Sequence, residues 1–215
     1  MKTKFVIFFS LLISIQVLSV AQTSVNLDYL VINTGDTLRG IVKYIDRRSV
    51  NHKKIRLIDT SGHKKKYKKK DISVFRVNNT IYEGFWLNQS PEKFQLLNPK
   101  YDIDIQNGEK YFLKLVSKGS LSHYELEWLE QGESTLLWMD LLKKEEDPFF
   151  IRATQGLFGL KRKVLIDYFF NCVNLKEKIN QKDLNKVSQI VYYYNKQWYQ
   201  SEQLQVYIFL KMVRQ

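Results

Sequence analysis

The chain has little of what usually stabilises, links or bends a protein: one cysteine, three prolines and nine glycines in 215 residues. A lone thiol at Cys172 cannot close an intrachain disulfide, so stability must come from a hydrophobic core, for which 44% apolar residues suffice. Because Phe169, Phe170 and Val173 lie beside it in the sequence, we predict that Cys172 is buried. A catalytic or interchain thiol is the alternative.

Long hydrophobic runs are also absent, with one exception at residues 5–20. Lys2 and Lys4 precede this run, and the small residues Ser19 and Ala21 follow it, which is the pattern of a cleaved signal peptide over residues 1–21. An uncleaved anchor is the alternative, but the run is shorter than the roughly 20 residues of a membrane span. A buried helix is the third reading. Cleavage would begin the mature chain at Gln22, in the periplasm, at the outer membrane or outside the cell.

Acidic residues are scarce: 22 Asp and Glu stand against 34 Lys and Arg, and loss of Lys2 and Lys4 would lower the formal net charge from +12 to +10. The surplus is concentrated in one run with no acid before Asp71, which comprises Lys64, Lys65, Lys66, Lys68, Lys69 and Lys70. We predict that this run either contacts an anionic surface or is a solvated hairpin. Export makes nucleic acid an improbable partner and leaves lipid phosphates or acidic glycans.

Short strands separated by turn residues fill the segment 22–147. Gly35-Asp36, Ser61-Gly62 and Asn78-Asn79 each join two alternating runs, as in antiparallel hairpins. After Gly159 the apolar period becomes helical, with faces such as Val164, Leu165, Tyr168 and Phe169, or Val187, Ile190, Val191 and Tyr194. We therefore predict an α+β protein: an antiparallel, meander or barrel-like β-rich part over 22–147, a helical part over 148–200 and a tail over 201–215.

The chain resembles a group of exported proteins of Bacteroidetes-type bacteria to which no activity is assigned. The segments that carry the resemblance are Asn33–Gly40, Lys66–Ile72 with Tyr82-Glu83, Phe112–Gly119 with Tyr124-Glu125, Leu160–Lys163 with Tyr168-Phe169 and Cys172, and the Ala21-Gln22 junction. The resemblance implies export and a β-rich part followed by a helical part, and it implies no particular reaction.

Motifs for cofactor or metal chemistry are missing. No glycine-rich phosphate loop and no HExxH occur, and His52 and His63 flank the basic run, where we expect exposed turns, so we predict no cofactor and no metal. His123, Glu125 and Glu127 alternate along one predicted strand and therefore share a face. They are weak candidates for general acid–base catalysis. The alternative is that they form the solvent face of a sheet.

Aromatic residues are plentiful near the C-terminus. Successive residues of a helix lie about 100° apart, so Tyr192, Tyr193, Trp198 and Tyr199 cannot all face one core. They could contact a partner or be covered by the tail. The sequence thus favours a non-enzymatic binding or structural module of the cell envelope, whose partner would be an envelope protein, a glycan or an anionic lipid surface. The alternatives are a hydrolase using His123, or a membrane-surface protein held by the basic hairpin.

Overall fold

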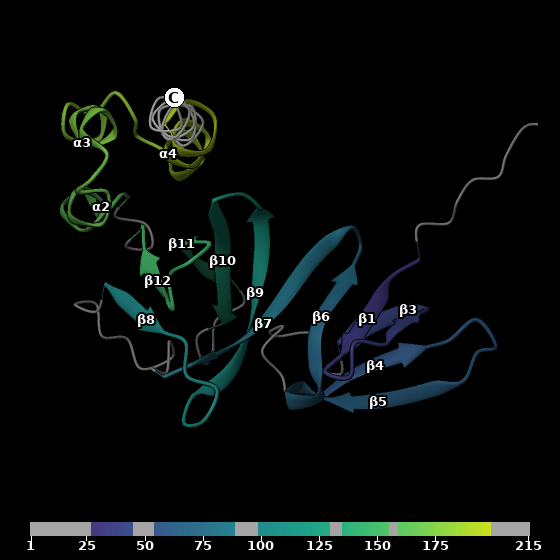
Figure 1. Ribbon diagram of the computed structural model, residues 1–215. Helices are drawn as coiled ribbons and strands as arrows, with labels where there is room; N and C mark the ends of the chain where they lie inside the picture. The colour runs from purple at the N-terminus through teal and green to yellow at the C-terminus, as the bar shows by residue number, and fades with distance from the viewer. Residues whose placement is uncertain (1–26, 45–53, 89–98, 130–134, 155–158, 199–215) are drawn as a thin grey trace, which may run out of the picture.

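The computed structural model describes residues 27–44, 54–88, 99–129, 135–154 and 159–198. In these ranges the chain forms a nine-stranded sheet, a three-stranded sheet and a C-terminal group of helices (Figure 1). The predicted α+β class is confirmed. The predicted signal peptide, His52, Tyr199 and the tail 201–215 lie outside the described residues. In the described part, no helix has the length and apolar character needed to cross a bilayer.

The first hairpin pairs β1 (Tyr29–Ile32) with β2 (Thr37–Arg39) through a turn at Gly35, whose φ of +94° suits glycine. The predicted second strand of this hairpin is split at Gly40. A Cβ there would lie 2.2 Å from the Ile58 carbonyl oxygen, so only glycine lets the chain pass this close. Beyond Gly40 the chain enters the other sheet as β3 (Ile41–Tyr44).

The small sheet consists of β3, β4 (Lys54–Ile58) and β5 (Lys64–Lys68), all antiparallel. A 3-10 turn, Lys69–Asp71, leads from it into β6 (Ile72–Val77), which pairs with β1 and with β7 (Thr80–Leu87). The inner face of the small sheet packs on these strands of the large sheet. Their shared core contains Leu30, Val42, Ile55, Leu57, Ile72, Phe75, Tyr82 and Phe112.

The rest of the large sheet curls around a second core. Its strands are β8 (Lys100–Asp102), β9 (Glu109–Ser117), β10 (Leu121–Leu129), β11 (Leu136–Lys144) and β12 (Phe149–Arg152), in the order β7-β9-β10-β11-β12-β8. Asn88 N donates to Asp102 O (3.0 Å) and Asp104 N to Trp86 O (2.9 Å), so β8 returns to β7. This barrel-like ring encloses Leu87, Tyr101, Tyr111, Leu113, Tyr124, Leu126, Met139, Leu141 and Phe150.

The first helix begins at Arg162, but the segment 148–200 assigned to the helical part opens with a strand. Strand β12 falls within the segment 148–200 assigned to helices, because Phe149–Ile151 pair with β8 across a separation that local pattern does not reveal. The helices are α2 (Arg162–Tyr168), α3 (Val173–Asn180) and α4 (Val187–Tyr193), followed by a π-helical turn, Tyr194–Trp198.

A third core joins these helices to the outer side of the barrel-like ring. It contains the predicted helical face Val187, Ile190, Val191 and Tyr194, together with Leu121 and Leu142 from β10 and β11. Cys172 belongs to the same core and is 1% exposed, which confirms that the thiol is buried.

Candidate functional site

The outer face of the small sheet carries a continuous set of cations. Ile55 and Leu57 point into the core, so Lys54 and Arg56 point to the opposite side. The register places Lys43 opposite Arg56, and Arg56 opposite Lys66. Lys54 likewise lies opposite Lys68, and Ile58 opposite Lys64. We call this surface the basic face; it consists of Lys43, Lys54, Arg56, Lys64, Lys66 and Lys68.

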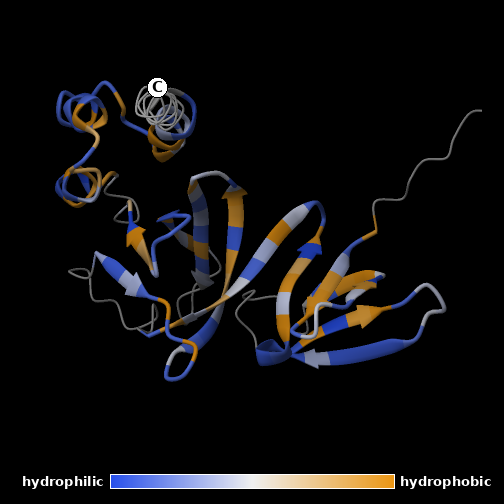
Figure 2. Cartoon of the chain, in the orientation of Figure 1, coloured by the Kyte–Doolittle hydropathy of each residue, from blue (hydrophilic) through white to orange (hydrophobic). Residues whose placement is uncertain are grey.

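Only half of the predicted lysine run belongs to this face. Lys65 points to the other side of β5, where its Nζ lies 5.1 Å from the centre of the Tyr67 ring. Lys69 Nζ lies 3.4 Å from Glu109 Oε1 and 4.9 Å from the Tyr111 ring. Lys70 leaves β5 in the 3-10 turn. Figure 2 shows β5 as an almost wholly hydrophilic edge strand.

The cations of the basic face form no ion pair with any described residue. Like charges directly opposite each other in a sheet are destabilising. Asp59, which lies between Arg56 and Lys64 in the sequence, is engaged in its own turn: Asp59 Oδ1 accepts hydrogen bonds from the backbone of Ser61 and His63. The folded chain therefore holds several cations together without compensating charge.

The row containing His123, Glu125 and Glu127 does share one face of β10, but it is not a solvent face. His123 is 4% exposed and lies beside α4, whereas Glu127 is 8% exposed and bonds to Tyr82 of the core beneath the small sheet. The expectation of a solvated strand face was wrong for these two side chains. With Lys114 and Asp140, these residues form what we call the polar row.

Each charged group in the polar row has a hydrogen-bond or ion-pair partner. Lys114 Nζ donates to Glu125 Oε2 (2.7 Å) and lies 3.4 Å from Glu127 Oε1. Tyr82 donates its hydroxyl to Glu127 Oε2 (3.2 Å). The hydrogen bond to Glu125 raises the pKa of Lys114, and burial opposes this only in part.

His123 forms the second half of the row. Its Nε2 lies 2.7 Å from Asp140 Oδ1, and Thr154 donates its hydroxyl to Asp140 Oδ2 (2.8 Å). The backbone N–H of Asp140 donates in turn to the Thr154 oxygen. His123 Nδ1 is buried and has no hydrogen-bond partner among the described residues.

The polar row does not assemble a hydrolytic centre from the three predicted residues. The His123 ring lines a cleft of about 700 Å³ between the β9–β10 hairpin and α4, whereas Glu125 and Glu127 bond to Lys114 and do not line it. A general base needs access to the proton it removes, and Nδ1 is closed to solvent. The two glutamates therefore lend no support to the hydrolase hypothesis.

The predicted aromatic surface is only partly present. Tyr192 is 62% exposed and lines the same cleft as His123. Tyr193 is half-buried against the helical core, with Lys178 Nζ 5.8 Å from its ring centre. Trp198 ends the π-helical turn, and Tyr199 lies outside the described residues. A continuous patch of these four rings is not shown.

His63 and Asp104 lie in turns outside the strands. His63 has a side chain that is 84% exposed and lies 3.6 Å from Asp59. Hydrogen bonds from the backbone and side chain of Asn107 and the backbone of Gln106 lower the pKa of Asp104. Within the described ranges, no three His, Cys, Asp or Glu side chains cluster as metal ligands would.

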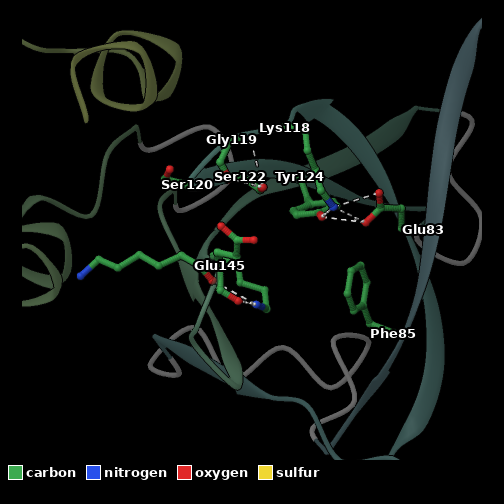
Figure 3. Close-up of a pocket in the computed structure, with 10 residues that line it drawn as sticks. Glu83, Phe85, Lys118, Gly119, Ser120, Ser122, Tyr124 and Glu145 are labelled. Carbon is green, nitrogen blue, oxygen red and sulfur yellow. Dashed lines mark hydrogen bonds and ion pairs between the residues drawn. The ribbon is translucent and has the colours of Figure 1, made fainter. Parts of the chain in front are cut away.

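The mouth of the barrel-like ring holds a pocket that the sequence did not indicate. Its volume is about 500 Å³, and it is lined by residues of β7, the β9–β10 turn, β10, the end of β11 and the β11–β12 turn. Tyr124 donates its hydroxyl to Glu83 Oε2 (2.7 Å), and Lys118 Nζ lies 3.1 Å from both Glu83 oxygens and from the Tyr124 oxygen (Figure 3). These three residues come from separate strands or turns, and no local motif connects them.

Comparisons with known protein families, with curated proteins and with solved structures found no match to this chain. The function of the chain is therefore inferred from the geometry of the basic face, the polar row and the mouth pocket.

Proposed function

We propose that this chain is an exported, non-enzymatic binding protein that attaches to an anionic lipid surface through its basic face. The observation that carries the proposal is the cross-strand register, which sets Lys43, Arg56 and Lys66 in one row and Lys54 and Lys68 in another. An anionic partner would relieve the repulsion within both rows. The predicted signal peptide over residues 1–21 supports a location in the cell envelope, where such surfaces occur.

The shape of the basic face favours a surface over a single anionic thread. Neighbouring strands lie about 4.8 Å apart, and alternate residues on a strand about 7 Å apart, so three strands present a two-dimensional array of cations. Ile41, which is 51% exposed, and Ile58 lie opposite each other on the same face. A planar array of charges with apolar side chains at its edge matches lipid headgroups and the acyl boundary beneath them.

The expected strength is moderate and depends on salt. A lysine close to an anionic bilayer contributes about 1 kcal/mol, so three of them should change the affinity by about two orders of magnitude. The Debye length falls from about 30 Å at 0.01 M salt to about 8 Å at 0.15 M. Binding should therefore weaken steeply over that range.

The test is sedimentation of the protein from Gln22 onward with vesicles of phosphatidylglycerol and phosphatidylcholine, against vesicles of phosphatidylcholine alone. One variant changes Lys64, Lys66 and Lys68 to Gln, which removes three cations of the basic face. The matched control changes Lys65, Lys70 and Lys163 to Gln, which removes the same charge from exposed side chains elsewhere. We expect the first variant to lose most of the salt-sensitive binding and the control to keep it.

Equal losses in the two variants would show that net charge, and not the basic face, governs binding. Absence of binding to anionic vesicles would refute the proposal. The proposal would also be refuted if the protein bound a soluble acidic polysaccharide, such as alginate, and anionic vesicles did not displace that polysaccharide.

Export is tested separately. The intact mass of the protein recovered from the periplasm or medium should correspond to a chain that begins at Gln22. A membrane-bound species that retains Met1 would contradict cleavage and would favour the uncleaved anchor.

A further inference from the structure

The mouth pocket has the chemistry of a binding site, and it is remote from the basic face. Glu83 and Phe85 of β7 line one wall, and Gly119 and Ser120 of the β9–β10 turn line another. The β11–β12 turn contributes Glu145 and is fixed to the β9–β10 turn by a hydrogen bond from Glu145 N to Ser120 O (3.0 Å). The pocket volume of about 500 Å³ is within the range of small-molecule sites.

One part of this lining is already arranged by its own hydrogen bonds. Tyr124 and Lys118 both donate hydrogen bonds to the Glu83 carboxylate. These bonds hold the hydroxyl, ammonium and carboxylate groups close together. Burial, and then the bond to Glu83, raises the pKa of Tyr124, so its hydroxyl stays protonated and remains a donor. This wall therefore carries opposite charges that are joined by their own hydrogen bonds.

The facing wall offers an acceptor that no described residue occupies. The backbone of Glu145 is bonded to Ser120, but its carboxylate has no hydrogen bond or ion pair with the described residues. In Figure 3 Glu145 from one side and Phe85 from the other point toward the same space. Phe85 packs edge-on against Phe150 (4.9 Å between ring centres) and Tyr124 (5.4 Å), so the ring is held in place.

The charge pattern limits the ligand. An anion would meet Glu83 and Glu145, and a cation would meet Lys118 and Lys143. The ammonium group of Lys144 points away from the pocket, over the Tyr168 ring. An uncharged ligand with many hydroxyl groups has donors for the carboxylates and acceptors for the lysines and Ser120. Its C–H face can also lie on the partly buried Phe85 ring.

We propose that the mouth pocket binds a neutral saccharide unit, with Glu145 accepting hydrogen bonds from its hydroxyl groups and Phe85 contacting its apolar face. This site is independent of the basic face: it opens at the barrel-like ring, whereas the small sheet lies at the other end of the molecule in Figure 1.

The test is titration calorimetry of the protein from Gln22 onward with three neutral disaccharides: maltose, cellobiose and N,N′-diacetylchitobiose. Glu145→Gln should weaken the binding of the preferred disaccharide by about tenfold or more, since hydrogen bonds to a charged acceptor are the strong ones. Glu146→Gln is the matched control, because Glu146 is also exposed and adjacent but does not line the pocket. Phe85→Leu, which keeps apolar bulk in the core, should also weaken binding while circular dichroism stays unchanged.

Failure to bind any of the three disaccharides would overturn the proposal, as would equal affinities of the Glu145→Gln and Glu146→Gln variants. Binding of spermine in place of the disaccharides would overturn it in favour of a cation site. The Lys64, Lys66 and Lys68 variant should bind the disaccharide normally, and Glu145→Gln should still bind vesicles. The two proposals can therefore fail independently.

Discussion

The basic face and the polar row are both charged surfaces of antiparallel strands, yet they handle charge in opposite ways. On the basic face, Arg56 lies between Lys43 and Lys66, with no described acid to balance them. In the polar row, Lys114 lies between two glutamates, and His123 is paired with Asp140. The first surface is exposed and its cations repel one another, whereas the second is largely buried and each of its charged groups has a partner.

This difference separates a surface suited to binding from one suited to stability. Buried charges must be paired, because an unpaired charge away from water costs far more than a pair. Exposed cations can stay unpaired at a small cost in stability, and a protein that retains such a cost often does so for function. We therefore attribute the polar row to the stability of the fold and propose the basic face as the binding surface.

The largest effect on stability is expected from removing the buried pair formed by His123 and Asp140. Asp140→Ala would leave His123 Nε2 and the Thr154 hydroxyl without their partner, and we expect it to lower the free energy of unfolding by about 3 kcal/mol. His123→Ala should cost a similar amount. On an exposed strand face it would cost less than about 0.5 kcal/mol, so burial changes this expectation. Urea unfolding measures both.

Asp183→Ala is the control for these two variants, since Asp183 is exposed and has no described ion pair. It should stay within about 0.5 kcal/mol of the unmodified protein. If Asp140→Ala were equally mild, the polar row would not be the stabilising half of the comparison.

The second prediction concerns the Lys114 end of the row. Lys114→Ala should lower stability by about 2 kcal/mol, because it leaves Glu125 and Glu127 facing each other without a cation. Replacing all three together, as Lys114→Met, Glu125→Leu and Glu127→Met, should recover most of that loss, since an apolar set of similar volume needs no pairing. Urea unfolding of the single and triple variants gives the answer. A triple variant as unstable as Lys114→Ala would show that the charges themselves are needed.

The third prediction concerns a buried neutral group, the hydroxyl of Tyr168 on α2, which is also hydrogen-bonded to a carboxylate. Burial, and then the hydrogen bond from Tyr168 to Asp147 Oδ2 (2.5 Å), raises the pKa of Tyr168. Below pH 10 the hydroxyl is protonated in the folded and the unfolded state, so it adds no pH dependence. Above pH 10 only the unfolded state loses the proton, and stability should fall by up to about 1.4 kcal/mol per pH unit. Tyr124, with its raised pKa, should contribute in the same direction.

Tyr168→Phe tests this assignment. The variant should lose about 1 kcal/mol at neutral pH, because Asp147 and the Lys144 N–H lose a hydrogen-bond partner. Above pH 10 the stability of the variant should decline less steeply than that of the unmodified protein. The difference in slope should approach about 1.4 kcal/mol per pH unit, which corresponds to one proton. Equal slopes in urea unfolding between pH 9 and 11 would contradict the buried, hydrogen-bonded hydroxyl.

Local patterns predicted much of the fold. The turns at Gly35, Gly62 and Asn78-Asn79 depend on backbone angles that these residues favour, and the helical face at Val187–Tyr194 depends on spacing alone. Strand β12 was missed because its pairing with β8 joins segments far apart in the sequence. His123 was placed on a solvent face because alternation shows which residues share a face, but not what covers it.

The candidate sites also divide into features that follow from local sequence pattern and features that depend on contacts between distant segments. Alternation along β5 separates Lys64, Lys66 and Lys68 from Lys65, but the partners Lys43 and Arg56 follow only from the register. The mouth pocket brings together Glu83, Lys118 and Glu145 from three turns and strands. Such a convergence has no period or motif, so only the closed ring of strands reveals it.

The smallest expected change in stability is also the sharpest test of the comparison. Lys66→Glu places an acid directly opposite Arg56, so it replaces a like-charge pair with an opposite-charge pair. We expect stability to rise by about 0.5 kcal/mol. Vesicle binding should fall by about tenfold or more, since the variant reverses a charge at the centre of the basic face.

Lys163→Glu on α2 makes the same change in net charge at an exposed position outside the basic face and should leave vesicle affinity far less affected. A Lys66→Glu variant that loses stability, or that binds vesicles as Lys163→Glu does, would mean that the cations of the small sheet are a solvated face and not a binding surface.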